Sequence, residues 1–206
     1  MERSFFITGT DTDVGKTLVS SWLLLHLESY SYWKPIQCGS LEFSDTDFVK
    51  QITKLPEKSF LKPIYEFKAP LSPHEASRLE SVNIEINKFK LPQKKKLVVE
   101  GAGGLLVPIN EEFFVIDIIK KLKIPVILVC RSCLGTINHS LLSIECLKKR
   151  KIDIAGVILS GEKNKKNKEA IQNYGEVNIL AELDNINPIN RSKLVATSPY
   201  FLEKNN

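Results

Sequence analysis

The stretch FFITGTDTDVGKTLVS, residues 5–20, decides the fold. The apolar run Ser4–Thr8 predicts a buried β-strand, and Lys16–Leu27 predicts an apolar helix. The loop between them ends in Gly15-Lys16-Thr17, and such a glycine-containing loop between a strand and a helix is typical of phosphate binding. The first glycine is Gly9, one position earlier than the usual spacing puts it, so this loop is one residue longer than the common form.

The loop supplies the groups that bind a triphosphate. Backbone N–H groups at a helix start, here those of Asp13, Val14 and Gly15, hold phosphate oxygens together with the positive end of the helix dipole. We expect Lys16 to place its charge near the β- and γ-phosphates, and the Thr17 hydroxyl to bind Mg²⁺. The alternative is a surface turn with an incidental Gly-Lys-Thr sequence.

Further apolar runs of strand length alternate with helical patterns along the chain. We expect strands at Tyr32–Ile36, Lys96–Glu100, Pro125–Cys130, Ile154–Ser160 and Val177–Ala181, and helices at Asp45–Lys54, Phe114–Leu122, Thr136–Lys149 and Lys165–Tyr174. This alternation predicts an α/β fold, a doubly wound, mostly parallel sheet with helices on both faces, as in P-loop NTPases. The proline-rich stretch Leu55–Leu91 is expected to carry loops.

The composition is that of an ordinary globular protein. With 43% hydrophobic residues in a chain of 206, we expect one domain over residues 1–206. The formal charge of +5 lies in short basic runs such as 148–151, which lack interleaved aromatic residues, so we expect no nucleic-acid partner. Because no apolar stretch approaches the roughly 20 residues of a membrane span, we expect a cytoplasmic protein with no membrane partner.

Residues able to carry chemistry follow the predicted strands, where ligands bind in this class of fold. Lys34 lies at the end of the second strand and is placed to hold an anion beside the phosphate loop, although it could instead extend from the sheet edge into water. Glu100 ends the third strand and is a candidate Mg²⁺ ligand. The glycines of Gly101-Ala102-Gly103 would let the backbone approach a ligand, or form only a turn. After the fourth strand, Asn138 is equally compatible with a site and with a helix cap.

These segments together resemble the dethiobiotin synthetase family. The matching stretches are GTDTDVGKT at 9–17, KPIQCG at 34–39, SPHEA at 72–76, VEGAGGLLVP at 99–108 and LGTINH at 134–139. The resemblance implies an enzyme that uses ATP, Mg²⁺ and CO₂ to close the ureido ring on 7,8-diaminononanoate. It also implies that the longer loop spacing is a family form, and that the protein is a homodimer in which LGTINH reaches the neighbour's substrate site.

The resemblance assigns roles to particular positions. Lys16 and Lys34 would be catalytic, and Thr17, Glu100 and one aspartate of SDTDF would hold Mg²⁺; Asp47 fits that aspartate best by the apolar spacing that follows it, with Asp45 as the alternative. The residues expected at ATP are Asp13, Val14, Gly15, Lys16, Thr17, Asp47, Glu100, Gly101, Ala102, Gly103 and Ser160. Those expected at the diamine and carbamate are Thr12, Asp13, Lys34, Cys38 and Asn138.

The sequence departs from the family at three places. Cys38 stands where the family usually has Ser or Thr, Ser160-Gly161 stands where an Asn-Asp type pair reads adenine, and Ala181–Asp184 lacks the family's proline. We therefore expect weaker base discrimination than is usual in the family. The alternative class is the partition and septum-positioning ATPases, which share the fold, but they carry a second lysine early in the loop, where this chain has Asp11.

Overall fold

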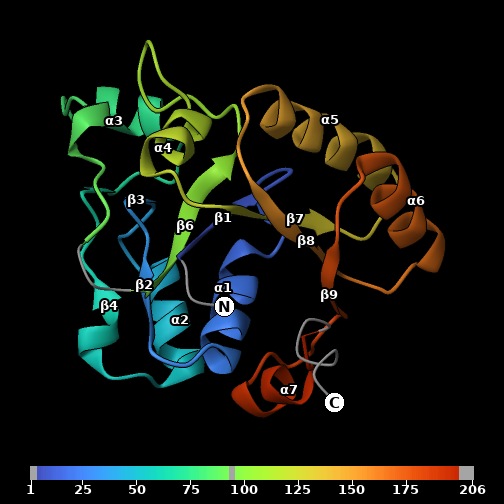
Figure 1. Ribbon diagram of the computed structural model, residues 1–206. Helices are drawn as coiled ribbons and strands as arrows, with labels where there is room; N and C mark the ends of the chain where they lie inside the picture. Colours follow the sequence, from blue (N-terminus) through green and yellow to red (C-terminus); the bar gives the residue numbers. More distant parts are fainter. Residues whose placement is uncertain (1–3, 93–95, 200–206) are drawn as a thin grey trace.

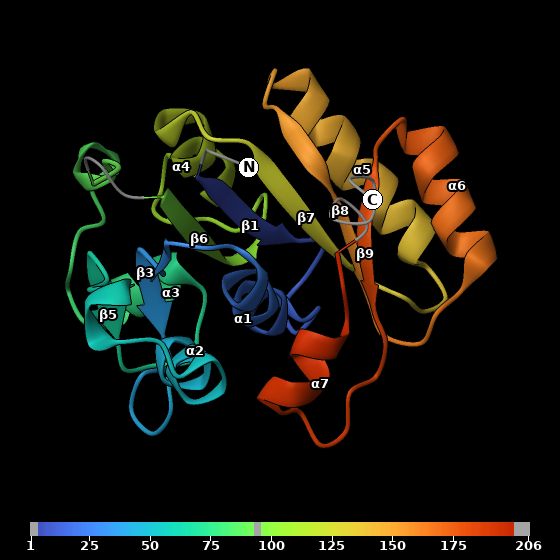
Figure 2. The ribbon, with the colours of Figure 1, turned by 60° about the horizontal axis from the view of Figure 1, so that its bottom comes forward.

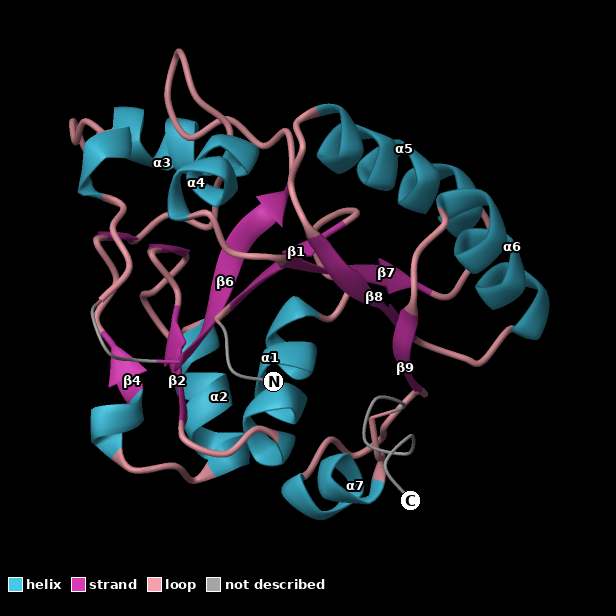
Figure 3. Ribbon diagram, viewed as in Figure 1, coloured by secondary structure: helices cyan, strands magenta, loops and turns pink. Residues whose placement is uncertain are grey.

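The computed structural model describes residues 4–92 and 96–199, and its centre is a seven-stranded sheet (Figure 1). The strand order is β4-β2-β6-β1-β7-β8-β9, and every neighbouring pair is parallel. A separate two-stranded sheet pairs β3 with β5. The predicted α/β fold is confirmed, with helices on both faces of a parallel sheet (Figure 3).

The elements follow the predicted alternation closely. The strands are β1 (Phe5–Gly9), β2 (Tyr30–Trp33), β3 (Ile36–Cys38), β4 (Phe60–Leu61), β5 (Tyr65–Phe67), β6 (Lys96–Gly104), β7 (Val126–Arg131), β8 (Ile154–Ser160) and β9 (Ile179–Leu183). The helices are α1 (Lys16–His26), α2 (Asp45–Thr53), α3 (Pro73–Leu79), α4 (Val115–Leu122), α5 (Thr136–Lys149), α6 (Lys165–Gly175) and α7 (Arg191–Ala196), with 3₁₀ turns η1 (Glu57–Ser59) and η2 (Ile86–Lys88).

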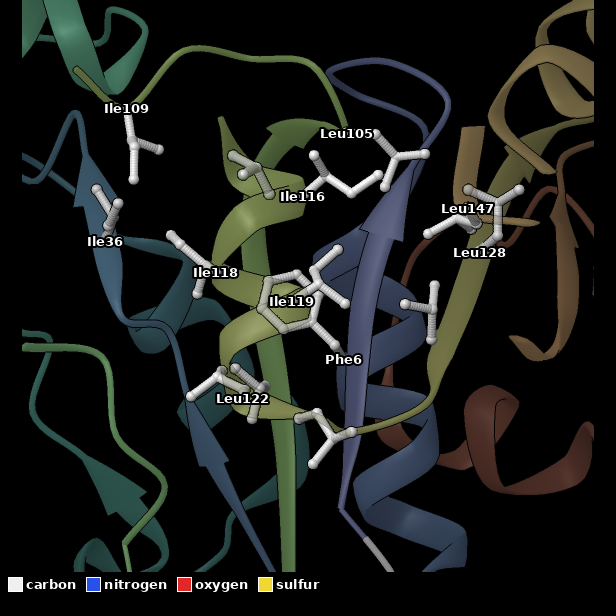
Figure 4. Close-up of a cluster of buried hydrophobic side chains, with 14 of the residues drawn as sticks. Phe6, Ile36, Leu105, Ile109, Ile116, Ile118, Ile119, Leu122, Leu128 and Leu147 are labelled. Atoms are coloured by element: carbon white, nitrogen blue, oxygen red, sulfur yellow. The ribbon is translucent and has the colours of Figure 1, made fainter. Parts of the chain in front are cut away.

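Successive side chains of the central strands fill two cores, one on each face of the sheet. Phe6 of β1 lies in the core beneath α4, α5 and α6, whereas its neighbours Phe5 and Ile7 lie in the core beneath α1, α2 and α7. Figure 4 shows side chains of α4, among them Ile119, directed toward Phe6. This alternation follows from the two-residue period of a strand, and it explains why a strand buried on both faces is continuously apolar.

The predicted strand Tyr32–Ile36 is wrong as a single element. β2 ends at Trp33, and the chain resumes as β3 at Ile36 in the other sheet. Pro35 lies at the break and has no N–H to donate to a sheet ladder, while its carbonyl accepts from the N–H of Ile64 at 2.8 Å. Lys34 is therefore fixed where β2 leaves the main sheet.

Three further differences concern element ends and short elements. β6 continues through the glycines to Gly104, so Glu100 lies inside the strand and not at its tip. The stretch 55–91, expected as loops, holds β4, β5, α3 and two 3₁₀ turns. The sequence did not predict α7, which lies beside α1 (Figure 2) and is joined to it by a 2.7 Å hydrogen bond from the Trp22 indole N–H to the Thr197 carbonyl.

Within the described ranges, every helix is too short or too polar to cross a membrane.

Candidate active site

A cavity of about 810 Å³ opens at the carboxyl ends of the central strands, beside the start of α1. Its charged part brings together residues from the loop after β1, the end of β2, the start of α2 and the middle of β6. The lining residues predicted from the sequence are Thr12, Asp13, Gly15, Lys16, Thr17, Lys34, Cys38, Glu100, Ala102 and Gly103. The edge predicted to bind ligands therefore gathers these residues around one space.

The loop after β1 turns sharply into α1 at Gly15. Gly15 has a φ of 94°, and a Cβ there would lie 2.6 Å from the Ser160 Oγ, so both the backbone and the space require glycine. Lys16 folds back over the loop and donates from Nζ to the Asp11 carbonyl at 2.9 Å. The loop thus places a lysine and the N–H groups of a helix start at the cavity, the arrangement that binds phosphate.

Glu100 is the centre of the site. Its carboxylate is fully buried and accepts hydrogen bonds from two elements that flank it. Oε1 lies 2.9 Å from the Thr17 hydroxyl and 3.0 Å from the Lys34 Nζ. Oε2 accepts from the Ser20 hydroxyl at 2.7 Å and the Tyr32 hydroxyl at 3.0 Å. A buried carboxylate is costly unless it is paired in this way, so these contacts fix its position.

Lys34 joins Glu100 to a second carboxylate, Asp45. The Lys34 Nζ lies 2.6 Å from the Asp45 Oδ2, and the Thr17 hydroxyl lies 2.7 Å from the Asp45 Oδ1. Burial would lower the pKa of Lys34, but Glu100 and Asp45 outweigh burial and raise it. Burial likewise would raise the pKa of Asp45, but Lys34 lowers it. Lys34 therefore stays an ammonium ion and Asp45 a carboxylate at neutral pH.

The two lysines of the site differ in their electrostatic surroundings. Burial lowers the pKa of Lys16, and the raising effect of Glu100 and Asp45 offsets this only in part because the charge of Lys34 acts in the same direction as burial. Two ammonium groups thus face one cavity, and only Lys34 is held by carboxylate contacts. Such a pair can attract two anions into the same space.

The prediction that Asp47 joins Thr17 and Glu100 is wrong, because the structure places Asp45 there. Asp47 instead accepts from the N–H of Ser44 at 3.0 Å, and Ser44 accepts from the N–H of Asp47 at 3.1 Å. This reciprocal pair is a capping box, which satisfies free N–H groups at the start of α2. The sequence carried the signal, since Ser44 and Asp47 have the S-x-x-D spacing of a capping box.

Two of the remaining predicted residues, Val14 and Gly101, are not among the described residues that line the cavity. Val14 is buried in the core beneath α1, and Gly101 lies against the Phe6 ring. The others divide into two groups. Thr12, Asp13, Cys38, Ala102 and Gly103 line the cavity. Burial raises the pKa of the Cys38 thiol to about 11, with the charge of Lys34 opposing the rise, so the thiol is neutral at pH 7.

The structure does not bring Asn138 and Ser160 to the cavity wall. Asn138 is exposed on the first turn of α5, next to the fully exposed Leu134. Ser160 ends β8, and its side chain lies against Gly15 of the phosphate loop. Within a single chain, neither side chain is among the described residues that line the cavity.

Sequence reasoning missed an apolar wall of the cavity. Its members come from the segments around α2, from the loop before α3 and from the segment after β6: Phe43, Phe48, Pro70, Leu71, Pro73 and Val107. Phe43 is 54% and Leu71 46% exposed. The cavity therefore joins a charged half to an apolar half, which suits a molecule with a polar reacting end and a hydrocarbon part.

Comparisons with known proteins show the family of the chain. A family model described as "AAA domain" matches residues 3–193. The ATP-dependent dethiobiotin synthetase BioD of Lawsonia intracellularis is 50% identical over 190 residues, covering 92% of each chain. The ATP-dependent dethiobiotin synthetase BioD of Paramagnetospirillum magneticum is 43% identical over 198 residues, covering 96% of this chain and 95% of that one.

The fold has more distant likenesses. A ParA family ATPase from Chlorobium tepidum superposes with a TM-score of 0.52 over 98% of this chain and 92% of that chain, at 9% identity. This likeness shows the fold alone, whereas the two sequence relatives match over 92% and 96% of this chain. The chain belongs to the ATP-dependent dethiobiotin synthetase family.

Proposed function

We propose that this protein closes the ureido ring of dethiobiotin from 7,8-diaminononanoate and CO₂ at the expense of ATP. One amine takes up CO₂ and loses a proton to give a carbamate, whose oxygen attacks the γ-phosphorus of ATP and releases ADP. The second amine attacks the carbonyl carbon of the mixed anhydride, which releases phosphate and closes the ring. The names of the relatives and the two-part cavity support this reaction. We place the enzyme, a single domain over residues 1–206, in the cytoplasm, which supplies ATP.

The observation that carries the proposal is a second buried lysine, Lys34, that opens on the same cavity as Lys16. The reaction must bring two anions, the carbamate and the γ-phosphate, within bonding distance. Preorganised positive charge lowers the barrier to such an approach more than an acid–base pair would. Lys16 serves the phosphate and Lys34 the carbamate, and the contacts from Glu100 and Asp45 hold Lys34 without any rearrangement during the reaction.

A magnesium ion fits the oxygens beside Lys34. The Thr17 hydroxyl has one proton and lies within hydrogen-bond distance of both Asp45 and Glu100, so three oxygens form a compact cluster. Mg²⁺ in nucleotide sites commonly uses one or two carboxylates, with phosphates and water completing its six ligands. The described residues include no group of three or more Asp, Glu, His or Cys side chains able to hold a metal alone, which agrees with a site that the nucleotide completes. When bound, Mg²⁺ neutralises charge on the phosphates.

A partition-type switch ATPase is the rival that the fold allows. Such a protein hydrolyses ATP in response to partners and has no use for a diamine. The experiment measures ADP release with and without 7,8-diaminononanoate and bicarbonate, and identifies the product by mass spectrometry. We expect ADP release to require both additions and to match dethiobiotin formed. ADP release that ignores both compounds would refute the proposed reaction.

The proposal includes a homodimer in which Asn138 reaches the neighbour's substrate site. Its support is the exposure of Leu134 just before α5, and of Asn138 and Leu142 (57% exposed) in the first half of that helix, outside the described lining of the chain's own cavity. An Asn138→Ala variant mixed with a Lys34→Gln variant should recover activity, because one site of the heterodimer takes both intact residues. No recovery after verified subunit exchange would show that each site is built from one chain.

A further inference from the structure

The carboxylate of Glu100 is held by two matched pairs of side chains. Helix α1 contributes Thr17 and Ser20, three residues apart on one face. The other pair is Tyr32, on strand β2, and Lys34, which follows directly after the last residue of that strand. In each pair one member contacts Oε1 and the other Oε2. The two oxygens of Glu100 are therefore held by different sets of groups.

The two sets differ in what they face. Thr17 and Lys34, at Oε1, line the cavity together with Glu100. Ser20 and Tyr32, at Oε2, are fully buried behind it and are absent from its described lining. Burial, followed by the adjacent Glu100 charge, raises the pKa of Tyr32 well above its usual value, so its hydroxyl remains a donor. Oε1 of Glu100 therefore contacts groups that line the cavity, whereas Oε2 contacts groups buried behind it.

We propose that Ser20 and Tyr32 are positioning residues that set the plane of the Glu100 carboxylate. The terminal torsion of a glutamate is broad, so contacts at Oε1 alone would let the carboxylate rotate. Two donors at Oε2, from a helix and from a strand, remove that freedom and keep Oε1 beside Thr17 and Lys34. The inference rests on the proposed function only in that Glu100 belongs to a Mg²⁺–nucleotide site; it does not depend on the identity of the diamine.

A purely structural role of Ser20 and Tyr32 would have different consequences from a positioning role. If Ser20 and Tyr32 only satisfied a buried charge, losing one hydroxyl would lower stability and leave the geometry at Oε1 unchanged. If they position Glu100, losing either hydroxyl weakens the magnesium-dependent part of nucleotide binding. Groups that orient metal ligands typically change metal affinity about 10- to 100-fold when removed.

The test is calorimetric binding of a non-hydrolysable ATP analogue to Tyr32→Phe and Ser20→Ala, in excess Mg²⁺ and in excess EDTA. We expect each variant to lose about tenfold of affinity in Mg²⁺ and less than about twofold in EDTA. The control is Tyr30→Phe, a hydroxyl removed from the same strand at a ring that stacks on Phe5. We expect it to match the wild type under both conditions.

Equal losses in Mg²⁺ and EDTA, or no loss in either variant, would overturn the proposal. Thermal unfolding of each variant identifies a protein that has not folded, and the other variant then decides the outcome. If neither variant folds, the hydroxyls serve folding and the positioning role is wrong. Because binding is measured without a diamine, failure of this inference is separate from failure of the proposed ring closure, which the product assay tests.

Discussion

The phosphate end and the base end of the nucleotide site are built in different ways. At the phosphate end, Thr17, Lys34, Asp45 and Glu100 hold one another through contacts of 2.6–3.0 Å. At the ends of β7, β8 and β9, where we propose that the base lies, Arg131 and Glu182 form ion pairs with other side chains of the protein. The Asn185 side chain lies beside Gly161 there. The difference teaches that the side chains proposed to bind the triphosphate are held in place by one another, whereas those at the proposed base end do not form such a network.

The base end shows this in detail. The Arg131 guanidinium pairs with Asp11 of the phosphate loop at 2.6 Å, and Glu182 pairs with Lys168 of α6 at 2.8 Å. Ser160 lies against Gly15. Among the described residues, the Ser132 hydroxyl at the end of β7 is buried without a hydrogen-bond partner. No paired amide of the kind that matches an adenine edge follows β8, where the chain has Ser160-Gly161.

The largest effect is expected at the two lysines of the phosphate end. Lys16→Gln should lower kcat by about 100-fold or more, the typical loss for one preorganised electrostatic contact in a transition state. Lys34→Gln should act mainly on the carbamate and so lower kcat/KM for the diamine. Steady-state kinetics with ATP and diamine varied separately checks both. Near-normal kcat/KM for the diamine in Lys34→Gln would remove Lys34 from the mechanism.

A smaller effect should separate the two aspartates of SDTDF. Asp45→Asn removes a carboxylate that contacts Thr17 and Lys34, so we expect activity to fall about 10- to 100-fold, with a higher Mg²⁺ requirement. Asp47→Asn is the matched control, since it changes the same atoms two residues away and weakens only the helix cap, by about 1 kcal/mol of stability. Activity titrated against Mg²⁺, with thermal unfolding, tells them apart. Loss of activity in Asp47→Asn alone would show that Asp47, and not Asp45, serves the magnesium site.

These aspartates also show which parts of the structure can be predicted from the sequence. The loop and the apolar runs predicted the sheet, because the spacing of local residues dictates strand, turn and helix. Apolar spacing favours Asp47 at the site, whereas its capping box with Ser44 holds it at the start of α2 and leaves Asp45 beside Thr17 and Lys34. The sequence could not predict the contacts of Ser20 and Tyr32, since these depend on three elements meeting at Glu100. The apolar wall from Phe43 to Val107 likewise joins segments far apart in the chain.

The base end predicts a weak preference among nucleotides. Strong rejection of a wrong base requires buried donors and acceptors that it leaves unpaired, and Ser160-Gly161 offers one rotatable hydroxyl. We expect GTP or CTP to support turnover within about tenfold of ATP, a difference of about 1.4 kcal/mol. Measuring kcat/KM for four nucleotides is the check. A preference for ATP of about a thousandfold, about 4 kcal/mol, would mean that an adenine reader exists outside these residues.

The smallest effect is expected at Cys38, which lines the cavity close to Lys34. With its pKa raised to about 11 by burial, Cys38 is a neutral thiol at pH 7, and a thiol is a weaker hydrogen-bonding group than a hydroxyl. Cys38→Ser should therefore lower the KM for the diamine by about threefold, close to the net worth of one hydrogen bond, and leave the KM for ATP unchanged. Cys146→Ser is the control, because Cys146 lies on α5 beside Arg150 and outside the cavity lining among the described residues. An unchanged diamine KM in Cys38→Ser would place the substrate out of reach of this side chain, and an equal change for ATP would place Cys38 at the phosphates.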